Sequence, residues 1–190
     1  AEELNFPDLK LSFTNNLAFA FYDTGNYDKS LKLWMGNIEN CRNFGWKEGV
    51  MHSLASSSLL FEEMGEPQRA ISQYIEALHI SRTIEDNYFQ SLIMCRLGSL
   101  YLMEGDVEKG IDFTKNAMTI ATEYRFKELL SDININMGEI HFIKGNKDRA
   151  VLCLNDVLSG ENAYQLARAY RLKYILDMHM HVKDMSDEYL

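Results

Sequence analysis

The stretch Leu97–Ile111, LGSLYLMEGDVEKGI, decides the fold of this chain. An apolar run with an aromatic residue precedes Gly105, and an acidic residue follows it directly. Related arrangements surround Gly25, Gly65 and Gly145, at intervals of forty residues. Chains that repeat with a period of about 20 to 50 residues are stacks of one unit that buries its apolar face only against its neighbours. The sequence therefore predicts an array of about four repeated units.

Each unit is predicted to be a pair of helices joined by a short turn at the glycine. Before each glycine, apolar residues recur at three- and four-residue spacing, the period of a helix with one buried face. The residue after the glycine can cap the next helix in three units, and Pro67 suits the first helical position in the other. Five residues past each glycine stands a small residue that permits close helix packing, namely Ser30, Ala70, Gly110 or Ala150. The residue before it is always basic, and we interpret Lys29, Arg69, Lys109 and Arg149 as solvated surface.

One spacing pattern around Gly65 and Gly105 is carried by Ala70, Tyr74, Ala77, Leu97, Gly98 and Tyr101. These residues resemble the tetratricopeptide repeat, whose pattern is W-x2-L-G-x2-Y, then a small residue, then an aromatic. The resemblance covers residues 11–160. The period exceeds the about 34 residues of the common repeat. In repeat length and layout the chain is similar to the Pins/LGN polarity adaptors and to bacterial Rap and peptide-pheromone receptor proteins.

The resemblance implies an all-α fold, a right-handed superhelical α-solenoid of antiparallel helix hairpins with about four full repeats and an extra C-terminal helix. We expect one domain over residues 1–190, with repeats at 8–44, 47–84, 87–124 and 127–159 and a last helix at 163–183. Aromatic residues such as Phe44, Trp46 and Tyr124 are expected to wedge between neighbouring hairpins. No partner helix follows the last helix, so it either caps the stack or marks a cut inside a longer protein. The absence of an initiator Met favours a fragment of a longer protein.

Composition excludes several classes of function. The net charge of −9 argues against nucleic-acid binding, because affinity for phosphates comes mostly from clustered Lys and Arg, and it makes a basic partner more plausible. No stretch reaches the about 18 to 20 apolar residues of a membrane span, and no signal peptide begins the chain, so we expect a cytoplasmic protein without membrane contact. Cys41, Cys95 and Cys153 fall on apolar helix positions and are interpreted as buried, reduced thiols.

The sequence carries no pattern of a catalytic or metal site. His179 and His181 are two residues apart on a predicted helix, so they point to different faces and cannot share a metal as an i, i+4 pair could. Ser56, Ser57 and Ser58 lack the turn and partners of a nucleophile. We therefore predict no enzyme, no cofactor and no metal.

The resemblance places the candidate partner-binding groove on the first helix of each hairpin. The groove positions are Asn15, Asn16, Phe19, Tyr22, Leu59, Glu62, Arg96, Ser99, Asn136, Glu139 and Phe142. Amides, one arginine and aromatic residues suit a peptide or helix of a partner protein, while the alternative is that they solvate a concave face. The carboxylate clamp of heat-shock co-chaperones is not expected, because its basic positions read Ala55, Leu59, Cys95 and Ser99 here.

Three functional expectations follow from this groove. We prefer a non-catalytic interaction scaffold or adaptor that binds a protein or peptide, and the acidic net charge favours a basic partner. The alternative is a peptide-responsive sensor domain of a bacterial signalling protein or transcription regulator. The unpaired last helix could also form a homodimer with a second copy, because an open repeat end exposes apolar surface.

Overall fold

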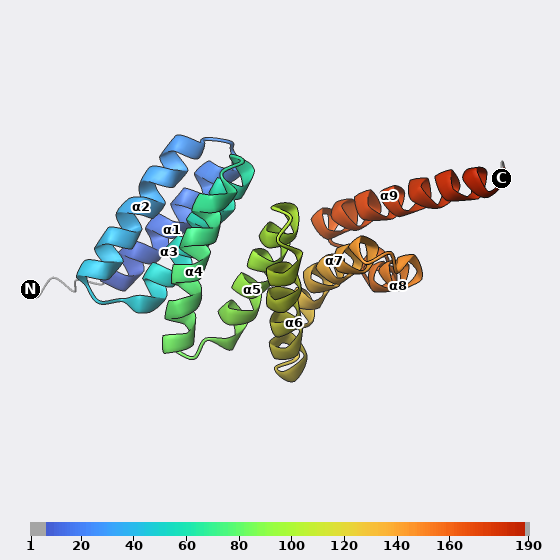
Figure 1. Cartoon of the computed structure of the whole chain (residues 1–190). Coiled ribbons are helices and arrows are strands. Elements are labelled where there is room, and N and C mark those ends of the chain that lie inside the picture. Colours follow the sequence, from blue (N-terminus) through green and yellow to red (C-terminus); the bar gives the residue numbers. More distant parts are fainter. Residues whose placement is uncertain (1–6, 189–190) are drawn as a thin grey trace, which may run out of the picture. The chain divides into compact units, whose positions relative to one another are not determined.

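The computed structural model describes the backbone of residues 7–188 and the side chains of residues 9–155, 157–162 and 165–177. Within these residues the chain is all-α, which confirms the predicted class (Figure 1). The helices are α1 (Pro7–Asp23), α2 (Tyr27–Asn43), α3 (Lys47–Glu63), α4 (Pro67–Thr83), α5 (Asn87–Met103), α6 (Val107–Glu123), α7 (Lys127–Ile143), α8 (Lys147–Leu158) and α9 (Ala163–Glu188). They form four helix hairpins followed by a last helix.

The forty-residue period divides into two equal halves. Each helix from α1 to α7 has 17 residues, and three residues join it to the next helix. The middle residue of each of these connections has a left-handed backbone conformation. Glycine occupies it at 25, 45, 65, 105 and 145, whereas Glu85 (φ 57°) and Arg125 (φ 59°) occupy it elsewhere. The predicted turn glycines are confirmed, and the turns between hairpins use the same geometry.

The turns are held mainly by the backbone. Asn26 donates its N–H to the carbonyl of Phe21, and Asn146 donates to that of His141, both at 2.8 Å. Side-chain capping was expected at three of these turns, but at the turns after Gly25, Gly65, Gly105 and Gly145 only Asp106 accepts such a bond, from the N–H of Lys109 at 3.2 Å. The amide side chains of Asn26 and Asn146 are not needed where the backbone already closes the turn.

Small residues let the two helices of a hairpin approach closely, as predicted. Ser30 is fully buried and its Oγ donates to the carbonyl of Ala18 at 2.8 Å. In the third hairpin a Cβ on Gly110 would lie 2.7 Å from the Leu102 side chain and 3.2 Å from the carbonyl oxygen of Gly98, so a larger side chain there would require its neighbours to shift. Ala70 and Ala150 fill the equivalent positions with no exposed surface.

The basic residue of each hairpin does more than solvate the surface. In three hairpins its cation lies over the aromatic ring of the first helix: Lys29 lies 5.2 Å from the Phe21 centroid, Arg69 4.0 Å from Phe61 and Lys109 5.0 Å from Tyr101. Cations attract ring faces at this range. The interpretation as surface alone is therefore corrected, because these cations also hold the two helices of a hairpin together. In the fourth hairpin the ring position is His141, close enough to Arg149 to feel its charge.

The aromatic residues between hairpins behave differently from one another. Trp46 packs closely over Gly49, where an added Cβ would collide with its ring. Phe44 and Tyr124 instead remain 61% and 48% exposed, so the predicted wedge is wrong for these two. Each of them lies at the end of a helix, beside the left-handed residue, where no neighbouring helix covers it.

Contacts group the chain into two compact units, Ala1–Ile93 and Met94–Leu190, with the division inside α5. In the first unit Trp34 forms a fully buried centre with Ala18 and Leu60. In the second, α9 packs against both α7 and α8, and Leu154, Leu172 and Leu176 belong to their shared core (Figure 1).

Candidate functional site

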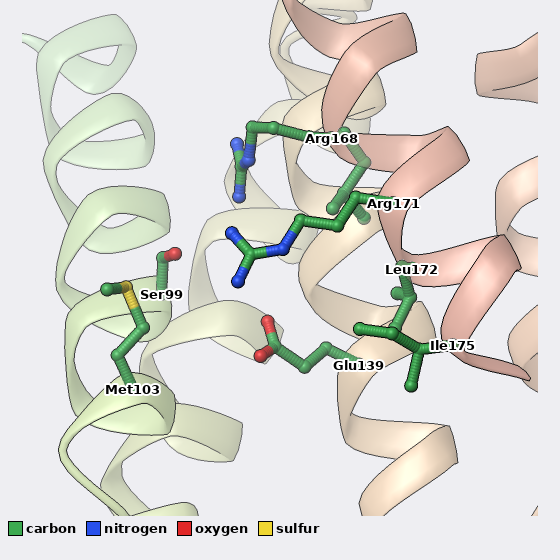
Figure 2. Close-up of a pocket in the computed structure, with 8 residues that line it drawn as sticks. Ser99, Met103, Glu139, Arg168, Arg171, Leu172 and Ile175 are labelled. Carbon is green, nitrogen blue, oxygen red and sulfur yellow. The ribbon is translucent and has the colours of Figure 1, made fainter.

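A pocket of about 200 Å³ opens between α5, α7 and α9. Its residues are Ser99 and Met103 from α5, Ile135 and Glu139 from α7, and Arg168, Arg171, Leu172 and Ile175 from α9. Figure 2 shows the side chains of Glu139 and Arg171 both reaching toward the space in front of Ser99 and Met103. The pocket thus combines an apolar floor with three charged side chains.

Arg168 is fixed at the edge of this pocket by a partly buried polar network. Its Nη1 lies 2.8 Å from Oδ1 of Asp132, and its Nη2 donates to Oδ1 of Asn136 at 3.2 Å. Asn136 is fully buried and its Nδ2 donates to the carbonyl of Cys95 at 2.9 Å. Gln165 adds a further bond to Asp132 at 3.1 Å. The network ties α5, α7 and α9 together and neutralises the charge of Arg168.

Glu139 differs from Arg168 because its charge is not neutralised by contact. Within the part of the chain whose side chains are described, no hydrogen bond or ion pair reaches its carboxylate. Burial raises the pKa of the Glu139 carboxyl, and the charges of Arg168 and Arg171 offset part of that rise. A partly buried carboxylate of this kind in a pocket is a candidate binding group.

A second pocket, of about 150 Å³, lies in the first unit between α1, α2 and α3. Asn15, Asn16 and Asn37 line it with His52 and Trp46. Asn37 is buried and donates through Nδ2 to the carbonyl of Leu11 and to Ser53 Oγ, while its Oδ1 has no partner among the described residues. This pocket offers amides, hydroxyls and the imidazole of His52, and its lining includes no Asp, Glu, Lys or Arg.

The structure brings the predicted groove residues together in part. Asn15 and Asn16 line the pocket of the first unit, and Ser99 and Glu139 line that of the second. Asn136 lies behind the second pocket, where it supports Arg168. These five predicted groove residues lie in or next to one of the two pockets described here.

The remaining predicted residues lie elsewhere. Phe19 and Tyr22 pack on the ring of Trp34, with centroids 5.0 and 6.0 Å apart. Glu62 accepts a hydrogen bond from the hydroxyl of Tyr74 at 2.6 Å, and so ties α3 to α4. The side chains of Leu59, Arg96 and Phe142 are partly buried, and Phe142 packs against the core of α7, α8 and α9.

Arg168 and Arg171 are pocket residues that the sequence reasoning missed. The last helix is expected either to cap the stack or to mark a cut in a longer protein, and the predicted groove includes none of its side chains. The signal was available in the register: Ile175 lies forty residues after Ile135, and Arg171 is four residues before Ile175, on the same helix face.

Among the described residues, no group of three or more His, Cys, Asp and Glu side chains is placed to hold a metal ion. No helix in that part of the chain is both long and apolar enough to cross a membrane. His179 and His181 lie outside the residues whose side chains are described.

The four hairpins and their turn geometry define a tetratricopeptide-like helical repeat, and comparisons with known proteins support this class of fold. No protein-family model matches the chain, and no curated protein is similar to it in sequence. Solved structures do match. One is BtubC (BKLC) from P. vanneervenii, with 21% identity and a TM-score of 0.70 over 93% of this chain and 69% of that one.

Two other solved structures name the repeat in their descriptions. A signal-transduction ATPase of the STAND class with a tetratricopeptide repeat sensor, from Pyrococcus horikoshii, is 17% identical with a TM-score of 0.70; the match covers 96% of this chain but only 27% of that one. The TPR-like repeats of a putative kinesin light chain from Podosopora anserina are 14% identical with a TM-score of 0.66, over 95% and 94% of the two chains. At these identities the likeness establishes the fold. A specific similarity to Pins/LGN or Rap proteins is not among these matches.

Proposed function

We propose that the chain is a non-catalytic protein-interaction scaffold that binds a peptide or helix of another protein along the first helices of its hairpins. One observation carries the proposal. Both pockets described above are built chiefly on these helices, and each contains predicted groove residues, Asn15 and Asn16 in one and Ser99 and Glu139 in the other. Peptide and helix partners insert individual side chains into pockets of this kind.

The size of these two pockets suits single side chains of a partner. At about 200 and 150 Å³ they fall below the range of about 300 to 1,000 Å³ that is typical of pockets for whole ligands. Each is large enough for a side chain of a larger partner. The net charge of −9 favours a basic partner.

Affinity capture with a groove variant tests the proposal. We would change Asn16→Ala, Arg96→Ala and Glu139→Gln together, because these side chains are at least partly exposed on the first helices. Asn136 is left intact because it is buried and supports the fold. The control variant changes Arg82→Ala, Asn116→Ala and Glu123→Gln, exposed residues on second helices.

We expect the groove variant to lose partners, measured by quantitative mass spectrometry, that both the unmodified chain and the control retain. Equal capture by all three proteins would contradict the scaffold proposal. Circular dichroism of each variant checks that its helices remain folded.

The sensor alternative has one supporting observation, since the repeats of the Pyrococcus horikoshii protein are described as a sensor. A sensor changes its conformational equilibrium when its ligand binds. Hydrogen exchange would then change in helices far from the bound peptide, whereas a scaffold would show protection only at the contact. Homodimerisation through residues 163–183 stays a prediction, and light scattering over a range of concentrations tests it.

A further inference from the structure

The charges in the pocket between α5, α7 and α9 are unevenly compensated. Arg168 is paired with Asp132 at 2.8 Å and bonded to Asn136, so its charge is already used inside the protein. Glu139 has no such contact among the described residues and is partly buried. Arg171 is exposed and reaches over the opening. The group in the pocket that most lacks a partner is therefore a carboxylate.

The floor of the pocket is apolar. Ile135 and Leu172 are 3% and 9% exposed and belong to the core, while Ile175 and Met103 extend the apolar surface to the opening. An apolar floor beside a carboxylate suits a lysine or arginine side chain, because the aliphatic stem favours apolar surface and the cationic end requires an anion or water. The cavity of about 200 Å³ holds one such side chain rather than a whole ligand.

We propose that this pocket binds a lysine or arginine side chain of the partner, with the stem on Ile135, Leu172 and Ile175 and the cation beside Glu139. The proposal rests on the scaffold function proposed above and adds the chemistry that the site recognises. A cation at this position compensates the carboxylate where water only partly reaches it, which is where a charged hydrogen bond contributes most. The acidic net charge of the chain attracts such a partner from a distance.

Arg171 has a role opposite to that of Glu139. Its guanidinium faces the same space and acts on Glu139 electrostatically, so it occupies the position that an incoming cation needs. Because Arg171 is exposed, it can turn into solvent at little cost. Removal of its charge should therefore strengthen cation binding, whereas removal of the Glu139 charge should weaken it.

Two small probes of equal length and opposite charge test this assignment on the full chain. n-Butylammonium reproduces the end of a lysine side chain, and butyrate has the same number of carbon atoms but ends in a carboxylate. Each is titrated at constant ionic strength and neutral pH while ¹H–¹⁵N NMR spectra follow the amides of residues that line the pocket, such as Ser99, Glu139 and Leu172. The variants are Glu139→Gln and Arg171→Gln, with Lys173→Gln, on α9 outside the pocket lining, as the matched control.

We expect n-butylammonium to shift the pocket amides of the unmodified chain more than butyrate does. Glu139→Gln should raise its Kd about tenfold, Arg171→Gln should lower it, and Lys173→Gln should leave it unchanged. Tighter binding of butyrate that Arg171→Gln weakens would overturn the proposal and identify an anion site. Absence of saturable shifts with either probe would also overturn it. In both cases the capture experiment could still succeed, so failure here is distinct from failure of the scaffold proposal.

Discussion

At the scale of single residues, Asn136 shows how a predicted contact residue can be a structural one. It is fully buried and connects the carbonyl of Cys95 on α5 to Arg168 on α9. Replacement with alanine leaves that carbonyl and the guanidinium without these bonds, and an unsatisfied buried group costs about 1–3 kcal/mol. We therefore expect Asn136→Ala to lower the free energy of unfolding by about that amount in urea denaturation.

The matched control is Asn134→Ala, two residues earlier on the same helix, where the side chain is only partly buried and no described residue bonds to it. We expect that change to stay within about 0.5 kcal/mol. Equal losses in the two variants would show that the network contributes nothing specific.

Glu139 should make stability depend on pH in a predictable direction. Burial raises the pKa of its carboxyl above the ordinary value of 4.5, with Arg168 and Arg171 of α9 acting against the rise. The folded state then holds the proton more tightly than the unfolded state does. The stability that this proton contributes is full below pH 4.5 and is lost as the pH rises through the folded pKa.

Glu139→Gln removes the partly buried charge, so it should stabilise the chain at pH 7 and have little effect below pH 4.5. Thermal unfolding at both pH values measures this, with Glu128→Gln on the exposed part of α7 as the control. A variant less stable than the unmodified chain at pH 7 would mean that attraction to the arginines exceeds the desolvation cost of burying the carboxylate.

The sequence could predict that Glu139 and Ser99 lie on the groove face of their helices, because the forty-residue register fixes which helix face they occupy. It could not predict that Asn136 would be covered or that Phe19 and Tyr22 would pack on Trp34. Those outcomes depend on which side chain of a neighbouring helix reaches the same place. The register alone does not contain that information.

At the scale of helices and turns, two glycines distinguish the effect of backbone conformation on stability from the effect of packing. Gly45 is left-handed (φ 71°), and Gly36 lies inside α2, yet an added Cβ would meet nothing within 4 Å at either position. An L-residue pays about 1 kcal/mol or more in the left-handed region, whereas alanine in a helix is favoured over glycine by about 0.5–1 kcal/mol. Gly45→Ala should therefore destabilise the chain and Gly36→Ala should stabilise it, as urea denaturation can measure. Changes of the same sign would contradict this explanation of the turns.

The turns between hairpins also mark a limit of sequence reading. Glycine made four turns visible at once, but the equivalent residues Glu85 and Arg125 carry no such signal although they adopt the same left-handed conformation. The surrounding helices impose that geometry on them. Replacement of either residue by glycine removes backbone strain from the folded state but raises the backbone entropy of the unfolded state. The variants should therefore be as stable as the unmodified chain or more stable, by at most about 1 kcal/mol in the same denaturation assay. A clear loss of stability would show that their side chains matter more than their backbone.

The fourth hairpin departs from the ring-and-cation pairing of the other three. Burial lowers the pKa of His141, and the charges of Arg149 and Lys144 lower it further. The Nδ1 atom of His141 is buried and has no hydrogen-bond partner among the described residues. The unfolded state thus binds the proton more tightly, and stability present above pH 6.5 is lost as the pH falls through the folded pKa.

His141→Phe gives Arg149 a ring face and removes the unsatisfied nitrogen. We expect a gain of about 0.5–1 kcal/mol at neutral pH and a larger gain below pH 6.5, where proton binding by the histidine in the unfolded state destabilises the unmodified chain. Melting curves at pH 7.5 and 5.5 test both parts. The reciprocal change Tyr101→His in the third hairpin should destabilise, since it removes the ring beneath Lys109.

At the scale of the whole molecule, the sequence period makes every hairpin an equal neighbour, whereas the contacts group the residues into two units that divide inside α5. The difference arises because the sequence period shows which residue types recur, but does not show how extensive the contacts at each helix interface are. In a repeat array, stability is approximately a sum of units and nearest-neighbour interfaces, so unfolding need not be a single step.

The two tryptophans of the chain allow this to be tested directly. Trp34 and Trp46 both belong to the first unit, so their fluorescence reports that unit, while circular dichroism reports the helices of both units. Asn136→Ala acts in the second unit and should lower the midpoint of part of the circular dichroism transition while it leaves the fluorescence midpoint nearly unchanged. Ser30→Ala, which removes the bond to the Ala18 carbonyl in the first unit, should shift the fluorescence midpoint instead. If both signals move together in both variants, the units unfold as one cooperative body and the division seen in the contacts has no energetic counterpart.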